Sequence, residues 1–262
     1  MTFSVTILGS SSAIPTLTRN PSAHLLNVNE RFFLIDCAEG TQLRLRKFKV
    51  HFQRIRHIMI SHLHGDHYFG LIGFLTSLHL LGRKDEMHLY APPQLEEIIR
   101  LQLEASETRL LYPLIFHPVT SFEKALIFED DRVTVHSFPL LHSIPTFGYL
   151  FREKIKVRRS ENKRSYAYCS DTAYDERIIP VVEGVDLLYH EATFMQDKAQ
   201  VAADKMHATT IGAATIALKS HVKKLLIGHY SARYDDLLPL LDEARTVFPN
   251  TFLSEDGTTF QL

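Results

Sequence analysis

Short apolar runs alternate with amphipathic segments along most of this chain. The apolar runs are rich in β-branched and aromatic residues and are too short for buried helices, so they predict strands. The amphipathic segments carry apolar residues three and four positions apart, which predicts helices. The predicted strands cover residues 2–8, 23–28, 31–37, 57–61, 87–90, 132–138, 147–151, 166–169, 186–189, 224–228 and 252–253, and the predicted helices cover 40–47, 68–81, 94–103, 209–220 and 237–247.

Strands interleaved with helices predict sheets that are covered by helices, which is an α/β architecture. No repeat, low-complexity tract or Pro/Ser-rich linker divides the 262 residues, so we expect a single domain over 1–262. Ligands and catalytic groups in α/β proteins gather where strands end. Four predicted strands end in Ser, His or Asp followed by a turn, at Ser61-His62, Ser170-Asp171, His190-Glu191 and Gly228-His229.

The composition is that of a globular protein, with 45% hydrophobic and 23% charged residues. No apolar run approaches the roughly 20 residues that span a bilayer. The chain starts with a predicted strand and has no basic segment before it, so we expect a cytoplasmic protein with no membrane attachment. Cys37 and Cys169 each end an apolar run and form no CxxC motif, which predicts buried reduced thiols rather than a disulfide.

The net charge of −1 hides a segregation of charge along the chain. No acid lies between Glu39 and Asp66, where six basic residues fall, and the run 152–164 carries a net charge of +5. Such segregation favours a protein that binds an anionic polymer on one face, with two solvated faces as the alternative. The candidate residues for binding such a polymer are Arg44, Arg46, Lys47, Lys49, Arg158, Arg159, Lys163 and Arg164.

The strongest chemical signal is the segment Ser61-His62-Leu63-His64-Gly65-Asp66-His67. His62 and His64 are two positions apart after a strand, so in extended backbone both imidazoles project to the same side and reach one ion. A turn at Gly65 then brings Asp66 and His67 in from a second direction, at the start of a helix. Closely spaced nitrogen and oxygen ligands suit zinc, with manganese as the alternative.

This HxHxDH segment, followed by single His and Asp residues after later strands, resembles the metallo-β-lactamase superfamily of dinuclear metal hydrolases. The later elements match at Leu141-His142-Ser143, Ser170-Asp171-Thr172 and Gly228-His229-Tyr230. Within the superfamily the chain is most similar to the tRNA 3′-processing endoribonucleases, tRNase Z. The segments that carry this likeness are 9–22, 33–42, Phe147-Gly148-Tyr149, His190-Glu191-Ala192-Thr193, Met206-His207-Ala208-Thr209 and Ser231-Ala232-Arg233-Tyr234.

The resemblance implies an αββα sandwich of two mixed β-sheets flanked by helices, with two zinc ions per chain. It assigns His62, His64, His142 and Asp171 to one ion, and Asp66, His67, His229 and Asp171 to the other. The resemblance further implies that metal-bound hydroxide would attack the phosphodiester after the discriminator nucleotide of a tRNA precursor. The resemblance makes Asp66 the proton acceptor, His207 the general acid and Glu191 its orienting partner. It also implies a homodimer, for which the amphipathic region 68–103 is the candidate interface.

One departure from the tRNase Z pattern concerns the long tRNA-binding arm between the third and fourth metal elements. His142 and Asp171 are only 29 positions apart, so the short basic loop at 152–164 stands in the arm's place. This leaves two alternatives: a phosphodiesterase of the same superfamily for small cyclic or choline-type substrates, and a non-catalytic metal-binding RNA-recognition subunit. Basic runs argue against the former, and intact catalytic residues against the latter.

Two further residues have open roles at this level. Asp36 follows a predicted strand and either orients a metal ligand or makes a structural turn. His190 precedes Glu191 and either supports the site or packs in the core.

Overall fold

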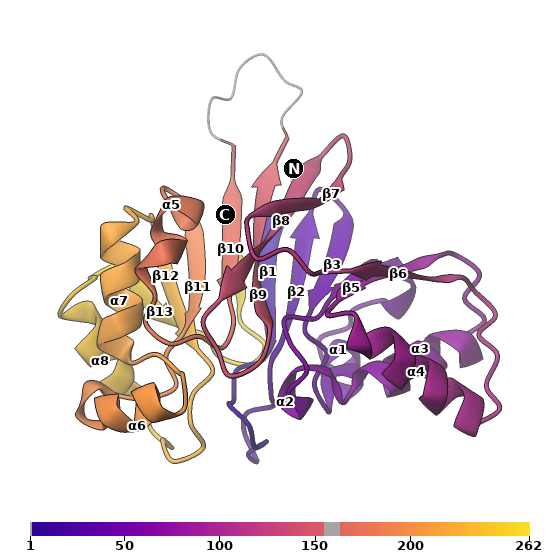
Figure 1. The fold of residues 1–262 in the computed structure, drawn as a ribbon, viewed down its shortest axis with the longest axis horizontal. Helices are drawn as coiled ribbons and strands as arrows, with labels where there is room; N and C mark the ends of the chain where they lie inside the picture. The colour runs from indigo at the N-terminus through magenta and orange to yellow at the C-terminus, as the bar shows by residue number, and fades with distance from the viewer. Residues whose placement is uncertain (1, 155–162) are drawn as a thin grey trace. The chain divides into compact units, whose positions relative to one another are not determined.

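The computed structural model describes residues 2–154 and 163–262. The chain divides into two compact units, one of residues 1–120 and 256–261 and one of residues 121–255 with Leu262. Each unit contains one seven-stranded mixed sheet with helices beside it (Figure 1). The expected pair of mixed sheets flanked by helices is therefore confirmed, and the single-domain organisation stays a prediction.

The sheet of the first unit has the strand order β14-β1-β2-β3-β4-β5-β6. Strands β3 to β6 run parallel to one another, whereas β14, β1, β2 and β3 pair in antiparallel fashion. The strands are β1 (Phe3–Gly9), β2 (Ala23–Val28), β3 (Arg31–Ile35), β4 (Ile55–Met59), β5 (Met87–Ala91), β6 (Leu114–Pro118) and β14 (Thr259–Gln261), and the helices are α1 (Thr41–Lys47), α2 (Gly65–Tyr68), α3 (Leu71–Leu80) and α4 (Gln94–Ala105).

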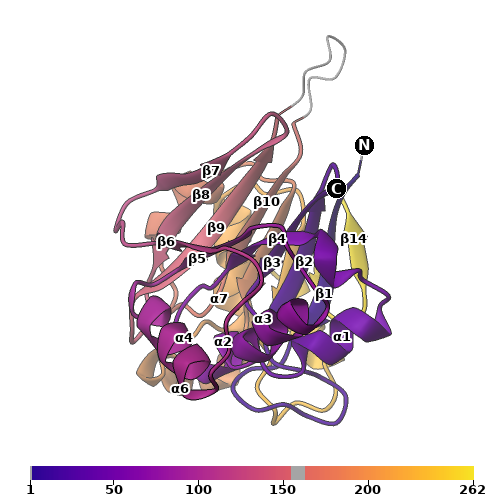
Figure 2. The ribbon, with the colours of Figure 1, turned by 90° about the vertical axis from the view of Figure 1, so that its right-hand side faces the viewer.

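The core of the first unit lies between this sheet and its helices. Leu34, Ile58 and Leu89 face the helices from three neighbouring strands, and Leu45 of α1 and Phe74 of α3 belong to the same buried cluster. Figure 2 shows α1, α3 and α4 along the sheet. Burying such side chains contributes roughly 1.5–3 kcal/mol each, which makes the sheet a firm base for the loops at its edge.

The sheet of the second unit has the strand order β13-β12-β11-β10-β9-β8-β7. Strands β10 to β13 are parallel, and β7 to β10 are antiparallel. The strands are β7 (Ala125–Glu129), β8 (Val133–Leu140), β9 (Thr146–Glu153), β10 (Ser165–Cys169), β11 (Leu187–Glu191), β12 (Leu225–Gly228) and β13 (Thr251–Leu253), and the helices are α5 (Ile179–Val182), α6 (Ala199–Asp204), α7 (Thr210–Lys219) and α8 (Leu238–Arg245).

The core of the second unit places α7 and α8 against the parallel strands (Figure 1). Ala213, Ala214 and Ala217 of α7 are buried in the cluster that contains Leu188 and Ile227 of the sheet. Small alanine side chains let the helix backbone approach the sheet closely. The side chain of Thr209 caps α7 by accepting a hydrogen bond from the Gly212 N–H at 3.1 Å.

The structure corrects several predicted elements. The helix expected over 68–81 is two helices, α2 and α3, because the N–H of Gly70 bonds the Cys37 carbonyl at 2.9 Å and the chain bends there. The pattern missed strands β6, β7 and β14, whose residues are only partly buried or exposed and so show weak alternation.

Candidate metal centre and proton donor

The histidines and acids singled out in the sequence follow the ends of parallel strands in each unit. In the first unit, Asp36 follows β3 and the segment 61–67 follows β4. In the second unit, Asp171 follows β10 and His229 follows β12, and Glu191 ends β11 between them. Parallel strands end at the same edge of a sheet, so each unit gathers its polar groups at one edge.

In the first unit, the carboxylate of Asp36 organises the histidine segment. Its Oδ1 accepts a hydrogen bond from the Ser61 N–H at 2.7 Å, and its Oδ2 accepts one from the Ser61 hydroxyl at 2.9 Å. The Nδ1 of His67 lies 2.8 Å from the same Oδ2. Asp36, Ser61 and His67 are fully buried. The sequence left the role of Asp36 open, and these bonds show it orienting His67 while also making a strained turn, with φ at +56°.

Close backbone packing brings Asp36 to His67. The Cys37 N–H donates to the His67 carbonyl at 2.8 Å. A Cβ on Gly70 would lie 2.0 Å from the Ala38 carbonyl oxygen, so only glycine allows the segment between α2 and α3 to approach the loop after β3.

The other side chains of the HxHxDH motif lie close to one another in the same unit. The Nε2 of His62 and the Nδ1 of His64 are 3.1 Å apart, and the Nε2 of His67 lies 3.6 Å from the Oδ2 of Asp66. That Asp66 oxygen also accepts a hydrogen bond from the Ala13 N–H at 2.7 Å. The structure thus brings the imidazoles of His62 and His64 together within this unit.

In the second unit, Asp171 faces two histidines with its two carboxylate oxygens. Its Oδ1 lies 3.2 Å from the Nε2 of His229, and its Oδ2 lies 3.8 Å from the Nε2 of His142. His142 donates its Nδ1–H to the Met206 carbonyl at 2.9 Å, so its Nε2 carries the lone pair. His229 has a left-handed backbone, with φ at +60°, which is a strained conformation for a non-glycine residue.

Glu191 is the buried centre of a second network. Its Oε1 accepts hydrogen bonds from the Thr172 N–H at 3.0 Å and from the Nδ1 of His207 at 2.7 Å. Its Oε2 accepts from the Thr193 N–H at 3.0 Å and from the Thr193 hydroxyl at 2.8 Å. Burial alone would raise the pKa of the Glu191 carboxyl, but the charge and hydrogen bond of His207 and the charge of His229 outweigh it and lower that pKa.

The donor atoms in each unit fit metal ions of the expected kind. Two nitrogen ligands of a tetrahedral zinc ion lie about 3.3 Å apart, because each Zn–N bond is about 2.0–2.1 Å long. The His62–His64 separation of 3.1 Å and the Asp171–His229 separation of 3.2 Å match this spacing. An aspartate whose two oxygens face two different histidines could also serve as a ligand to two ions. The ligand atoms of Asp171, His207 and His229 all lie within 4.8 Å of one another.

The predicted RNA-binding residues differ in what they contact. Arg44 makes an ion pair with Asp256 at 3.1 Å and is only 12% exposed, whereas Arg46, Lys47 and Lys49 are exposed. Arg158 and Arg159 lie outside the described residues.

At the other basic run, Lys163 is exposed, and Arg164 forms a two-point ion pair with the buried Glu153, at 2.6 and 2.8 Å. Arg44 and Arg164 therefore hold parts of the fold together.

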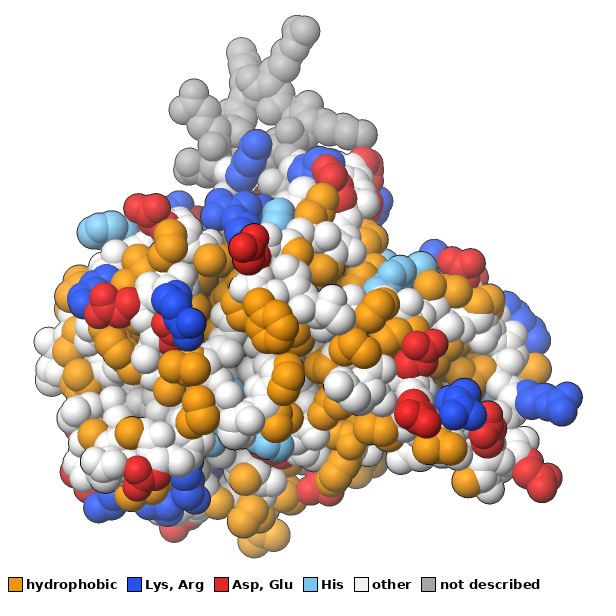
Figure 3. Space-filling view, viewed as in Figure 1, with side chains coloured by type: hydrophobic (Ala, Val, Ile, Leu, Met, Phe, Trp, Pro, Cys, Tyr) orange, Lys and Arg blue, Asp and Glu red, His pale blue; other side chains and the backbone are white. Residues whose placement is uncertain are grey.

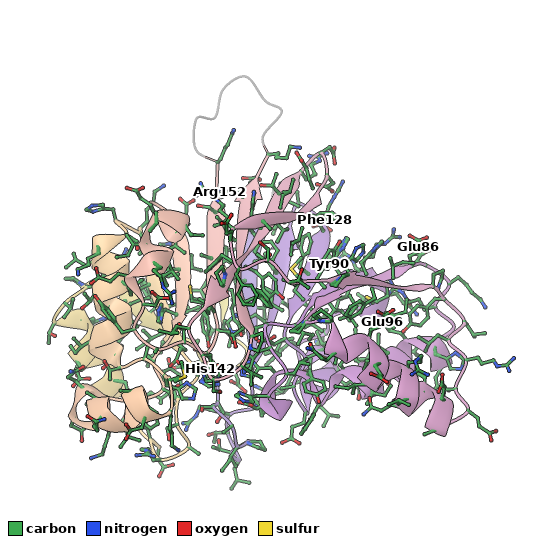
Figure 4. All side chains as sticks on the ribbon, in the orientation of Figure 1. Glu86, Tyr90, Glu96, Phe128, His142 and Arg152 are labelled. Atoms are coloured by element: carbon green, nitrogen blue, oxygen red, sulfur yellow. The ribbon has the colours of Figure 1, made fainter. Side chains whose placement is uncertain are left out.

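Arg152, the first residue of the second basic run, and His142 lie at opposite ends of the β8–β9 hairpin. His142 follows the end of β8, next to the pairing of Leu140 with Thr146, and Arg152 pairs with Thr134 six residues further along β9. Six residues of strand span about 20 Å. Figure 4 labels both residues at the two ends of these strands, and Figure 3 shows blue Lys and Arg side chains gathered above β8 to β10.

The cysteines agree with the sequence-based expectation of buried free thiols. Cys37 and Cys169 are buried free thiols, and burial raises the pKa of both. Among the described residues, no helix is long and apolar enough to cross a membrane.

Comparisons with known proteins identify the relatives of this chain. A family model described as Anti-Pycsar protein Apyc1 matches residues 3–245. The ribonuclease Z of Parabacteroides distasonis is 39% identical over 97% of each chain. That alignment has 296 positions against 262 residues here, so at least 34 positions of the relative have no counterpart in this chain.

Solved structures agree with the sequence relatives. The crystal structure of human tRNase Z, short form, is 30% identical, covers 98% of both chains and superposes with a TM-score of 0.85. The metallo-β-lactamase fold protein YhfI from Bacillus subtilis is 20% identical, covers 100% of both chains and superposes with a TM-score of 0.81. The sheets, strand-end histidines and acids thus define a protein of the metallo-β-lactamase fold. The chain belongs to the ribonuclease Z family and to the family that the Apyc1 model describes.

Two residues of the networks had no role in the sequence-based interpretation. Ser61 directly precedes the HxHxDH segment, and Thr193 ends the His190–Thr193 segment. Both hydroxyls contact a carboxylate and a histidine. Their positions beside the motifs are evident in the sequence, but the groups that these short hydroxyl side chains contact depend on the fold.

Proposed function

We propose that this protein is a metal-dependent endoribonuclease that removes 3′ trailers from tRNA precursors, cutting the phosphodiester after the discriminator nucleotide. The observation that carries the proposal is the Glu191–His207 pair, whose His207 ligand atom lies within 4.8 Å of those of Asp171 and His229. A polarised histidine next to metal ligands is what cleavage of a poor leaving group needs. Membership of the ribonuclease Z family supports RNA as the substrate.

The ligands are proposed to hold two zinc ions per chain. Following the family pattern, His62, His64, His142 and Asp171 hold one ion, and Asp66, His67, His229 and Asp171 hold the other. When bound, such ions neutralise phosphate charge and make water acidic enough to act as a nucleophile near neutral pH. The matched donor separations and the two-sided Asp171 carboxylate support this assignment.

The remaining roles belong to side chains that move protons. Asp66 accepts a proton from the attacking water. The ribose 3′ oxygen leaves as the P–O bond breaks, and His207 donates a proton to it, which contributes about 10²- to 10⁴-fold in rate. Glu191 accepts the Nδ1–H of His207 at 2.7 Å, so the transferable proton is on Nε2.

A tRNA transcript with a 3′ trailer tests the proposal directly. We expect one cut after the discriminator nucleotide, loss of activity on chelation, and recovery with zinc or manganese. Asp66→Ala should lose nearly all turnover and keep RNA affinity within a few-fold. Asp85→Ala, which removes a 60% exposed aspartate, is the matched control. Activity that resists chelation in protein holding less than one ion per chain would refute the mechanism.

The alternative substrate is a small phosphodiester. At least 34 positions of the Parabacteroides relative are missing from this chain, and a shortened tRNA-binding arm would weaken tRNA binding. A kcat/KM for bis-p-nitrophenyl phosphate or a cyclic nucleotide above that for precursor tRNA would favour this alternative. The intact Glu191–His207 pair argues against a non-catalytic RNA-recognition subunit.

We also propose a cytoplasmic homodimer. Within the region 68–103, Phe69, Leu80, Leu81 and Leu101 are 51–82% exposed, which is the kind of apolar surface that a second copy buries. The reduced thiols of Cys37 and Cys169 suit the cytoplasm. Light scattering gives the oligomeric state, and Leu80→Glu should shift a dimer to monomer.

A further inference from the structure

The same hydrogen-bond pattern is found in both units. In the first unit, the Ser61 hydroxyl lies 2.9 Å from a carboxylate oxygen of Asp36, 3.0 Å from the Nδ1 of His62 and 3.4 Å from the Nδ1 of His67. Asp36 meanwhile contacts the Nδ1 of His67 directly. One buried carboxylate thus reaches one histidine directly and a second histidine through a hydroxyl.

In the second unit, Thr193 occupies the place of the serine. Its hydroxyl lies 2.8 Å from the Oε2 of Glu191, 2.9 Å from the Nδ1 of His229 and 3.4 Å from the Nδ1 of His207. Glu191 contacts the Nδ1 of His207 directly. The backbone N–H of each hydroxyl residue also donates to its carboxylate, at 2.7 Å for Ser61 and 3.0 Å for Thr193.

The direction of these bonds follows from counting protons. Three N–H groups, from the backbone of Thr172 and Thr193 and the ring of His207, already donate to the two oxygens of Glu191, so this carboxylate is an acceptor. The single proton of the Thr193 hydroxyl therefore points to Glu191, and its oxygen accepts the Nδ1–H of His229. That leaves the lone pair of His229 on Nε2, the atom that lies 3.2 Å from Asp171.

The same reasoning applies to Ser61, which donates to Asp36 and accepts from the Nδ1 of His62. The lone pair of His62 is then on Nε2, which lies 3.1 Å from the Nδ1 of His64. A histidine binds a metal only through the nitrogen that lacks a proton, so the partner of the other nitrogen decides which atom is available.

We propose that Ser61 and Thr193 are equivalent positioning residues. The hydroxyl of each links a buried carboxylate to a metal-ligating histidine and fixes the Nε2 of that histidine as the metal-binding atom, and we call this link a hydroxyl relay. The inference rests on the proposed two-metal function. It extends that function by giving each metal one hydroxyl relay: Ser61 for the ion held by His62, and Thr193 for the ion held by His229.

Metal affinity tests this without any substrate. Zinc binding to metal-free protein is measured by competition with a chromophoric chelator. Thr193→Val keeps the side-chain shape and removes the hydroxyl, and Ser61→Ala does the same in the other unit. Each variant should bind one of the two ions about 10- to 100-fold more weakly, the usual effect of losing an orienting partner. Thr193→Ser should bind as the wild type does.

A matched control removes a threonine hydroxyl that has no such role. Thr215 lies in α7 and its hydroxyl donates only to the Ile211 carbonyl at 2.7 Å, so Thr215→Val should leave both affinities unchanged. Long-range proton–nitrogen NMR spectra of the metal-free protein report the tautomer directly. The Nδ1–H form of His229 should dominate in the wild type and Thr193→Ser, and should be lost in Thr193→Val.

The outcomes separate this inference from the proposed function. A wild type that binds fewer than two ions contradicts the two-metal function. If it binds two, and either folded variant keeps both affinities and the wild-type tautomer, the relay is refuted and the function stands. Circular dichroism verifies folding, and Ser61→Ala carries the test alone if Thr193→Val does not fold.

Discussion

The Nδ1 of His67 lies 2.8 Å from the Oδ2 of Asp36, and neither side chain is exposed to solvent. Asp36→Asn replaces one of the two acceptor oxygens by an NH₂ group, which donates hydrogen bonds and does not accept them. The changed side chain can therefore no longer accept both Ser61 bonds and the His67 bond. We therefore expect zinc affinity to fall about 10- to 100-fold.

Asp186 offers a matched control because it accepts the same pair of bonds from a serine. Its Oδ2 accepts the Ser165 N–H at 2.7 Å and the Ser165 hydroxyl at 2.9 Å, away from any predicted ligand. Asp186→Asn should change thermal stability without changing zinc affinity. Equal losses of affinity in both variants would mean that Asp36 acts only through the fold.

His207→Ala should slow cleavage of precursor tRNA by about 10²- to 10⁴-fold, because a positioned acid is lost from a poor leaving group. Zinc content should stay the same. A p-nitrophenyl phosphodiester needs little protonation of its leaving group, so its hydrolysis should fall much less. His51→Ala, which removes an exposed imidazole, is the control for both rates. Equal impairment on the two substrates would rule out the acid role.

The metal-free protein should lose stability in acid through its buried histidines. Burial lowers the pKa of His190, and its hydrogen bond to the Glu191 carbonyl offsets this only in part. Burial also lowers the pKa of His24 to about 3. The unfolded chain binds these protons near pH 6.5 and the folded protein does not, so stability is complete above that pH and falls below it, by up to about 1.4 kcal/mol per pH unit for each histidine.

Urea unfolding between pH 7.5 and 5 measures this effect. His190→Asn should unfold with a shallower pH dependence than the wild type, although its stability at pH 7.5 is lower. The exposed His221→Asn should follow the wild-type slope. Parallel curves for wild type and His190→Asn would show that His190 is protonated in the folded state.

Much of the fold could be predicted because its central strands are strongly apolar. The runs around Leu34, Ile58 and Leu188 are buried on both faces of their sheets, and their pattern is unambiguous. Edge strands β6, β7 and β14 were not predicted, because one side of each strand meets solvent and apolar and polar residues are mixed in its sequence. The break between α2 and α3 at Gly70 was not predicted, because it depends on the carbonyls of Cys37 and Ala38, which only the fold brings close to Gly70.

The candidate site followed the same division. Single histidines and acids with metal-ligand spacing, such as His62 and Asp171, stand out because few other functions need them there. The charge pattern was less informative about RNA-binding residues. It predicts Arg44 to be part of a basic face, yet Arg44 forms an ion pair with Asp256, which is more than 200 residues away in the sequence. No local pattern reveals a partner at that distance.

The two basic runs are the features that favour RNA over a small phosphodiester, and the ion pairs of Arg44 and Arg164 decide which residues test them. One variant changes Arg46, Lys47 and Lys49 to Ser, and the other changes Arg158, Arg159 and Lys163 to Ser. Each phosphate contact adds about 0.7 to 0.9 to the slope of log affinity against log salt. Losing three contacts should therefore flatten that slope for precursor tRNA by about two units.

A control with Lys84, Arg109 and Lys205 changed to Ser removes the same charge from exposed positions outside both runs and should keep the slope. Hydrolysis of p-nitrophenyl phosphodiester should be unaffected in all three. If the slope is unchanged in both test variants, the basic runs are solubilising surface, and a small phosphodiester becomes the better substrate.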